Sequence, residues 1–251
     1  MIDCHCHLEQ RDYYEDRDEV IKRCKKELRA VITCCAHPND FDFTMDIVEK
    51  YRNFVFATVS IHPIHIKEIN EKQRDEFFDR VKQNKDNIIG VGETGLDFLI
   101  EENEWKEKQK ELFVKFIYLA KELNKPLIIH ARKAFAETIE ILEKYDVKNV
   151  LMHFFSAKEL LEKVKNNGWY ISVNTTLLTS KKINKIVRDM PLERIMLETD
   201  SPWLGFGKRN EPLSIKQVAE KISEVKKLDF NFVWRQCGKN AVRFFKLPIK
   251  I

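Results

Sequence analysis

The amino-acid sequence predicts an α/β fold, specifically an eight-stranded (β/α)8 barrel of the TIM type. Three observations lead to this prediction. Short apolar runs alternate with helical periodicity, eight such runs fit within 251 residues, and histidines and acidic residues recur where the runs end. No linker, repeat or low-complexity segment interrupts the pattern, so we expect a single domain over residues 1–251.

The predicted strands are apolar runs of five to eight residues that are rich in β-branched and aromatic side chains. They span residues 1–7, 30–36, 54–61, 88–93, 126–131, 149–154, 170–174 and 195–200.

Helical periodicity fills most of the intervals between these strands. The stretch 17–28 places Val20, Ile21, Cys24 and Leu28 on one face of a helix. Stretches 105–124, 135–145 and 157–168 have the same period, and the last ends at Gly168, a residue typical of helix C-caps. Strands that alternate with helices pair in parallel. A doubly wound open sheet is the alternative, but no glycine-rich phosphate or dinucleotide motif follows the first strand.

Composition narrows the class of protein. Apolar residues make up 43% of the chain, yet no apolar run approaches the ~20 residues of a membrane span. No basic start followed by an apolar stretch marks the N-terminus, so we expect a cytoplasmic protein without membrane contact. The six cysteines are irregularly clustered and do not suggest a disulfide framework. The net charge of +4 permits an anionic substrate without requiring one.

The chain opens with "MIDCHCH", in which Asp3, His5 and His7 occupy alternate positions. On a strand all three would share one face, and Cys4 and Cys6 would point the other way. Two imidazoles so placed can bind one divalent cation. A polar N-terminal tail with chance histidines is the alternative.

Further residues of this kind fall at the predicted carboxyl ends of strands, where barrel enzymes build their active sites. They are His62, Glu93, His130, His153 and Asp200. Each alone has a structural explanation, such as a hydrogen-bonded histidine or an aspartate that caps a helix. These imidazoles and carboxylates, gathered at one mouth, would lack charge balance, which divalent cations would supply. His37 and His65 fall outside this set, in loops.

These residues belong to an ordered series of motifs. In chain order they are "DCHCH", "IHPIH", "GETGLD", "PLIIHAR", "HFFSA", "LETDSPWL" and "KRNEP". The series resembles that of the TatD family of metal-dependent deoxyribonucleases, within the amidohydrolase superfamily, and it covers essentially the whole chain. Ile61 and Ala157 stand where the family often has glycine, which affects loop shape rather than metal chemistry.

The resemblance implies a two-metal site with a defined set of ligands: His5, His7, Glu93, His130, His153 and Asp200. Glu93 would bridge the ions, with His5, His7 and Asp200 mainly on one and His130 and His153 on the other. Asp200 would be the general base, unless its role is coordination alone. Mixed imidazole and carboxylate ligands suit Zn, Mn, Co or Ni, with Mg as a further option.

The implied substrate is DNA, and several residues are candidates to contact it. Arg132 shares a strand face with His130 and would hold a phosphate, as would His62. Trp203 would stack on a base, while Lys208, Arg209 and Asn210 lie on one loop. Rim salt bridges, loop caps and ordinary packing are the alternatives. Glu198, two positions before Asp200, is expected to orient a ligand imidazole or to form an ion pair.

Other functions fit the same scaffold. Relatives in the superfamily hydrolyse amides, amines or esters, so an amidohydrolase or aminoacyl-ester hydrolase is the alternative. A non-catalytic binding protein with structural metal is a third, disfavoured because structural sites are usually closed. A monomer is expected by default.

Overall fold

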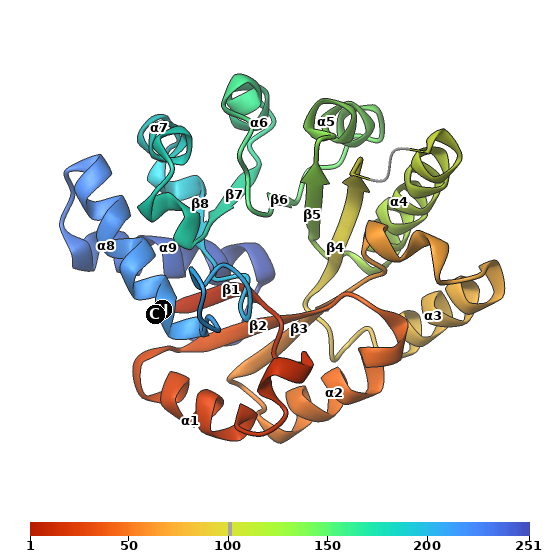
Figure 1. Cartoon of the computed structure of the whole chain (residues 1–251), viewed down its shortest axis with the longest axis horizontal. Helices are drawn as coiled ribbons and strands as arrows, with labels where there is room; N and C mark the ends of the chain where they lie inside the picture. The colour runs from red at the N-terminus through yellow and green to blue at the C-terminus, as the bar shows by residue number, and fades with distance from the viewer. Residues whose placement is uncertain (100–101) are drawn as a thin grey trace.

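The computed structural model describes residues 1–99 and 102–251, and within them eight strands form one parallel sheet in sequential order (Figure 1). The strands are β1 Ile2–Cys6, β2 Ala30–Cys35, β3 Val55–Val59, β4 Gly90–Asp97, β5 Leu127–Arg132, β6 Val150–Met152, β7 Tyr170–Val173 and β8 Ile195–Leu197. This order confirms the predicted barrel.

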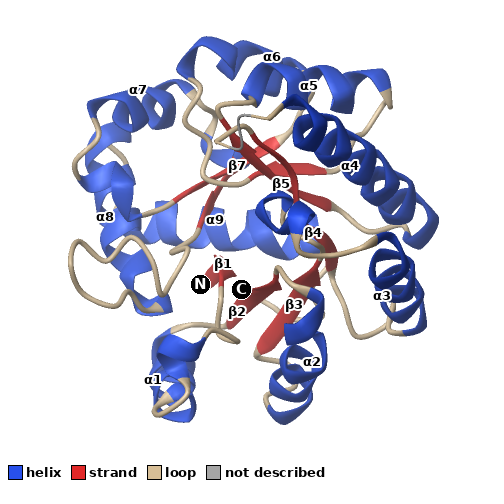
Figure 2. Cartoon of the chain, turned by 45° about the vertical axis from the view of Figure 1, so that its right-hand side comes forward, coloured by secondary structure: helices blue, strands red, loops and turns tan. Residues whose placement is uncertain are grey.

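Helices follow the strands and surround the sheet (Figure 2). They are α1 Arg17–Glu27, α2 Phe41–Lys50, α3 Glu71–Gln83, α4 Asn103–Leu123, α5 Phe135–Lys144, α6 Leu161–Asn166, α7 Lys181–Asp189, α8 Ile215–Lys226 and α9 Phe230–Phe245. The predicted helix at 157–168 is shorter than expected, because a 3-10 turn over Lys158–Leu160 precedes α6. Gly168 follows α6 with φ +69°, a left-handed conformation that glycine adopts without strain.

Hydrogen bonds beyond the sheet ladder join the first strand to the segment after the last. The backbone N–H of Thr199 and of Asp200 donates to His5 O, at 3.3 and 3.0 Å, and His7 N–H donates to Ser201 O at 2.8 Å. These bonds bring β1 and the end of β8 together at the carboxyl end of the barrel.

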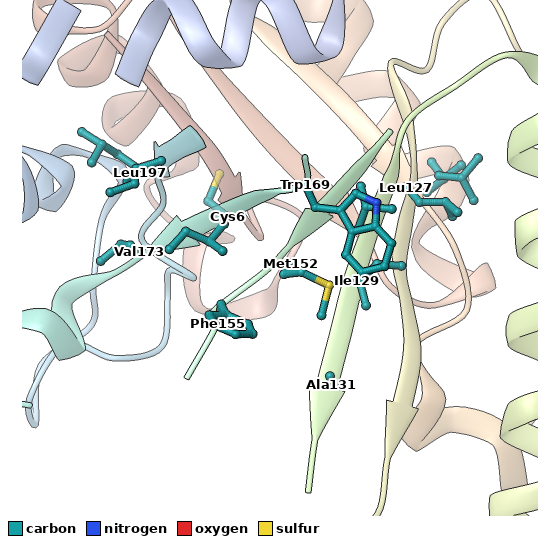
Figure 3. Close-up of a cluster of buried hydrophobic side chains, with 14 of the residues drawn as sticks. Cys6, Leu127, Ile129, Ala131, Met152, Phe155, Trp169, Val173 and Leu197 are labelled. Atoms are coloured by element: carbon teal, nitrogen blue, oxygen red, sulfur yellow. The ribbon is translucent and has the colours of Figure 1, made fainter. Parts of the chain in front are cut away.

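Two apolar layers stabilise the barrel. The outer layer lies between strands and helices, and Figure 3 shows part of it, including Leu127, Ile129 and Trp169. The inner layer includes Ile32, Ile128 and other strand residues, which pack against Ala241, Phe244 and Phe245 of α9. Helix α9 therefore covers the amino-terminal end of the barrel and leaves the carboxyl end for the site. None of the helices in residues 1–99 and 102–251 has the length and apolar character of a membrane span.

Strand boundaries differ from the sequence prediction where the candidate residues lie. Strand β4 continues to Asp97, so Glu93 lies within the strand rather than at its end. Strand β8 ends at Leu197, so Asp200 follows it in a loop with φ +56°. Aspartate tolerates this conformation better than most residues.

Candidate metal centre

A cavity of about 740 Å³ opens at the carboxyl end of the barrel. His7, Glu93, His130, His153 and Asp200 line it, and His5 lies fully buried beside them. The structure therefore brings together the six residues that the family resemblance implies as metal ligands.

The first group of donors comes from β1 and the loop after β8. The Nε2 atoms of His5 and His7 are 3.2 Å apart. Asp200 Oδ1 lies 3.7 Å from His5 Nε2 and 3.5 Å from His7 Nε2. The three atoms thus enclose one small space.

A β-bulge in β1 shapes this group. Asp3 pairs with Val31 but Cys6 pairs with Thr33, so β1 has one residue more than its partner between these points. Asp3 consequently shares a side with Cys6, and the expectation that it shares a face with His5 and His7 is wrong. Its carboxylate accepts hydrogen bonds from Thr199 Oγ1 at 2.6 Å and Thr199 N at 3.1 Å. Cys4 packs in the inner layer, so only Cys6 faces away as expected.

The second group of donors surrounds the other side of Glu93. Glu93 Oε1 lies 2.6 Å from His130 Nδ1, 3.4 Å from His153 Nε2 and 3.3 Å from His62 Nε2. His62 also accepts a hydrogen bond at Nδ1 from Ile64 N, so it caps the 3-10 turn Pro63–Lys67 as well as facing Glu93.

Glu93 divides its two carboxylate oxygens between the groups. Oε1 faces the second group, whereas Oε2 lies 3.3 Å from His5 Nε2 and 3.9 Å from His7 Nε2. A register shift between Val91 and Thr94 gives β4 an extra residue at this point. A carboxylate that presents one oxygen to each of two donor groups has the arrangement that bridges two cations.

Three further buried carboxylates support the imidazoles from behind. Glu9 Oε1 lies 3.1 Å from His7 Nδ1, and Asp97 Oδ2 lies 3.1 Å from His130 Nε2. Glu198 Oε2 lies 2.8 Å from His153 Nδ1. Such contacts fix the tautomer and orientation of a metal-binding histidine.

Of these carboxylates, the sequence pattern predicts a supporting role for Glu198 but not for Glu9 or Asp97. Glu9 lies two residues after His7, and Asp97 lies four residues after Glu93 in the same quoted motif. Even spacing was the available signal for Asp97, which ends β4, whereas Glu9 lies in a turn beyond β1, where strand alternation gives no guide.

The carboxylates and imidazoles perturb one another strongly. Burial alone would raise the pKa of Glu93, but His153, His62 and His130 hold it well below its usual range. Burial alone would lower the pKa of His153, but Glu198 and Glu93 raise it to about 10. Burial would also raise the pKa of Asp200, yet the neighbouring imidazoles, led by His7, keep it below its usual range. Both centre carboxylates are therefore ionised at neutral pH.

The donor set fits divalent cations on three grounds. Five carboxylates gather around four imidazoles, and two divalent cations would balance most of that negative charge. The first group's donors are 3.2–3.7 Å apart. Ligand atoms of a tetrahedral site with bonds of about 2.0–2.2 Å lie roughly 3.3–3.6 Å apart. Imidazole with carboxylate is also a usual ligand combination for Zn, Co, Ni or Mn.

The candidate substrate residues divide into two sets. Arg132 and Trp203 line the cavity, and the Trp203 and His7 ring centroids are 4.7 Å apart. Arg209 and Asn210 lie outside the lining, contrary to expectation. The Arg209 guanidinium binds both carboxylate oxygens of Asp16, at 2.7 and 2.6 Å. Asn210 is buried, where its side chain donates to Thr199 O and accepts from Glu211 N.

Two histidines outside the predicted set of site residues also reach the cavity. His37 and His65 line its wall beside His62. Their loops follow the neighbouring strands β2 and β3, which explains why the topology brings them together. No regular pattern in the sequence links positions in two separate loops.

The architecture and the donor set define a class of protein: a metal-dependent hydrolase built on a (β/α)8 barrel. A family model described as "TatD related DNase" matches residues 2–246. The chain belongs to the TatD family.

Relatives match over nearly the whole chain. The deoxyribonuclease TATDN3 of Homo sapiens is 33% identical over 259 residues, covering 98% of this chain and 94% of the relative. A metal-dependent hydrolase of Methanocaldococcus jannaschii is 34% identical over 248 residues, covering 98% and 96%. The crystal structure of a TatD family hydrolase from Entamoeba histolytica has the same fold, with a TM-score of 0.90, 23% identity and 97% of each chain covered.

Proposed function

We propose that the protein is a metal-dependent phosphodiester hydrolase that acts on DNA, with one domain over residues 1–251 and two divalent ions held at the cavity floor. The division of the Glu93 oxygens carries this proposal: Oε1 lies 2.6 Å from His130 Nδ1 and Oε2 lies 3.3 Å from His5 Nε2. In the proposed site His5, His7 and Asp200 hold one ion, His130 and His153 hold the other, and Glu93 contacts both.

The bound ions would lower the pKa of a water molecule and offset negative charge on the reacting phosphate. The protein's own contribution begins with Asp200, which is ionised and lines the cavity. We assign to it the acceptance of a proton from the attacking water, because a carboxylate at the cavity floor can take up that proton and pass it on. Glu9, Asp97 and Glu198 keep the imidazoles in the orientations that the site requires.

Substrate binding is assigned to Arg132 and Trp203, which also line the cavity. Arg132 is exposed, lines the cavity and has no acidic partner among the described residues, so its guanidinium is free to bind a phosphate. Trp203 is 47% exposed beside His7, which suits stacking on a base. The human relative is named a deoxyribonuclease, which also supports DNA as the substrate.

The test compares substrates with one enzyme batch and one metal. Single-stranded DNA is assayed beside a panel of cyclic amides and aminoacyl esters, with and without a chelator. We expect metal-dependent release of nucleotides from DNA and no comparable hydrolysis of the panel. Asp200→Asn, purified identically, controls for contaminating nuclease, which would persist in that preparation. Hydrolysis of amides or esters without nucleotide release would replace the nuclease proposal with the amidohydrolase alternative.

A further inference from the structure

A second group of potential metal ligands lies at the edge of the same cavity. His37 follows β2, and His65 and Glu68 follow β3, so two neighbouring loops contribute to it. The two imidazole rings meet edge to face, with centroids 4.7 Å apart and planes at 84°. His65 also lies near His62, with ring centroids 6.2 Å apart. Glu68 groups with His37 and His65 and not with the residues around Glu93.

The donor atoms of this group converge. Glu68 Oε1 lies 3.2 Å from His65 Nδ1, and Glu68 Oε2 lies 3.7 Å from His37 Nε2. One donor atom from each residue lies within 4.8 Å of the other two. We propose that His37, His65 and Glu68 bind a divalent cation at a site separate from the centre around Glu93.

Local charge supports this site. Among the described residues the ionic partners of Glu68 are these two imidazoles, and no lysine or arginine pairs with it. Burial and the neighbouring His65 lower the pKa of His37, so this imidazole is neutral at neutral pH and keeps a lone pair for a metal. Asp40 lines the same cavity wall and adds negative charge nearby. The surroundings therefore favour a cation over an anion.

Coordination requires a proton shift on both rings. His65 Nδ1, which lies 3.2 Å from Glu68 Oε1, must carry its proton on Nε2 instead. His37 Nδ1 accepts a hydrogen bond from Asn39 N at 3.1 Å, which places the ring proton on Nε2 in the neutral imidazole. A metal at Nε2 moves that proton to Nδ1 and displaces the Asn39 amide. Asn39 is exposed, so water replaces the lost partner of its N–H.

The site is open on one side. The side chain of Glu68 is 60% exposed and those of His37 and His65 are 18% and 24% exposed. Three protein ligands leave a tetrahedral cation with a free position for water or another ligand. Two imidazoles with one carboxylate suit Zn²⁺, Co²⁺ or Ni²⁺ better than Mg²⁺.

Titration of the metal-free full chain with Zn²⁺ tests the proposal, with stoichiometry measured by calorimetry and by metal analysis after gel filtration. The His37→Ala, His65→Ala double variant is expected to bind one ion fewer than wild type. Glu68→Gln is expected to lower the affinity for this ion. Glu71→Gln removes an exposed charge at the start of α3 and should leave that affinity unchanged. Equal stoichiometry in the wild type and the double variant would overturn the proposal.

The design separates this site from the proposed centre. The difference in the number of bound ions between wild type and the double variant reports the site at His37, His65 and Glu68. The number of ions left in the variant reports the proposed centre around Glu93. A second measurement is hydrogen exchange over residues 36–40 and 62–68, the two loops that the cation would join. Zn²⁺ should slow exchange in both loops of the wild type and not in His65→Asn. Exchange that slows equally in His65→Asn would count against the site.

Discussion

Glu198 offers the sharpest test of how the centre is supported. It is fully buried and accepts four hydrogen bonds. Oε2 accepts from His153 Nδ1 at 2.8 Å and Ser172 Oγ at 2.5 Å, and Oε1 accepts from Asn174 Nδ2 and Phe154 N, both at 3.0 Å. The residue thereby holds His153, β7 and the start of the loop after β6 in one network.

The expected cost of its removal follows from these contacts. Glu198→Ala leaves four donors without their partner, and an unsatisfied buried donor costs about 1–3 kcal/mol. Water that enters the vacated space satisfies some of them, so we expect a loss of about 3–4 kcal/mol in the free energy of unfolding. Glu198→Gln keeps the volume but turns one acceptor into a donor that faces other donors. Loss of such imidazole support typically reduces metal affinity about 10–100-fold.

Denaturant unfolding of the metal-free variants measures the first effect, and Zn²⁺ titration measures the second. Glu193→Ala is the matched control, because Glu193 is exposed just before β8. Glu198→Gln should lose affinity for one ion and retain the ion proposed to bind His5, His7 and Asp200. A loss below about 1 kcal/mol for Glu198→Ala would refute the hydrogen-bond reasoning. Unchanged metal affinity in Glu198→Gln would refute the orienting role.

Three other predictions concern the proposed centre. Glu93→Ala should lower the metal content found by elemental analysis, because both donor groups face this carboxylate; equal content would exclude Glu93 from the site. Asp200→Asn should reduce turnover more than metal occupancy, because an amide cannot accept the proton; parallel losses would leave coordination as its role. Arg132→Ala should slow cleavage of single-stranded DNA without changing metal content, and wild-type cleavage should show a shallow salt dependence, since few phosphates are engaged. Unchanged DNA kinetics in Arg132→Ala would remove Arg132 from the substrate contacts.

The order of elements could be predicted because it depends on local periodicity. Alternating apolar runs and helical stretches are sufficient for the parallel barrel, and the carboxyl ends of strands then meet at one mouth. Boundaries were less accurate where conformation depends on partners. Strand β4 runs past Glu93 to Asp97 because its later residues pair with β5 up to Arg132, and no local pattern reveals that pairing.

The candidate site was predictable in its residue types but not in its contacts. Residues that follow strands, such as His153, come to the cavity wherever the barrel forms. Arg209 and Asn210 do not line the cavity, although Trp203 of the same loop does. Asp16, the residue before α1, binds the Arg209 guanidinium, and Asn210 is buried against Thr199. His37 and His65 meet only because two loops fold against each other, which depends on tertiary packing.

Both register shifts in the described sheet lie in strands that supply the centre, β1 and β4. With strict alternation Asp3 would share a face with His5 and His7, and its carboxylate would compete with Asp200 for them. The extra residue in β1 instead turns Asp3 toward Thr199, which it binds through both backbone and side chain. These hydrogen bonds hold β1 against Thr199, the residue immediately before Asp200. The same irregularity thus turns one carboxylate away from the centre and anchors the segment that carries another, in keeping with the tendency of bulges beside active sites to redirect side chains.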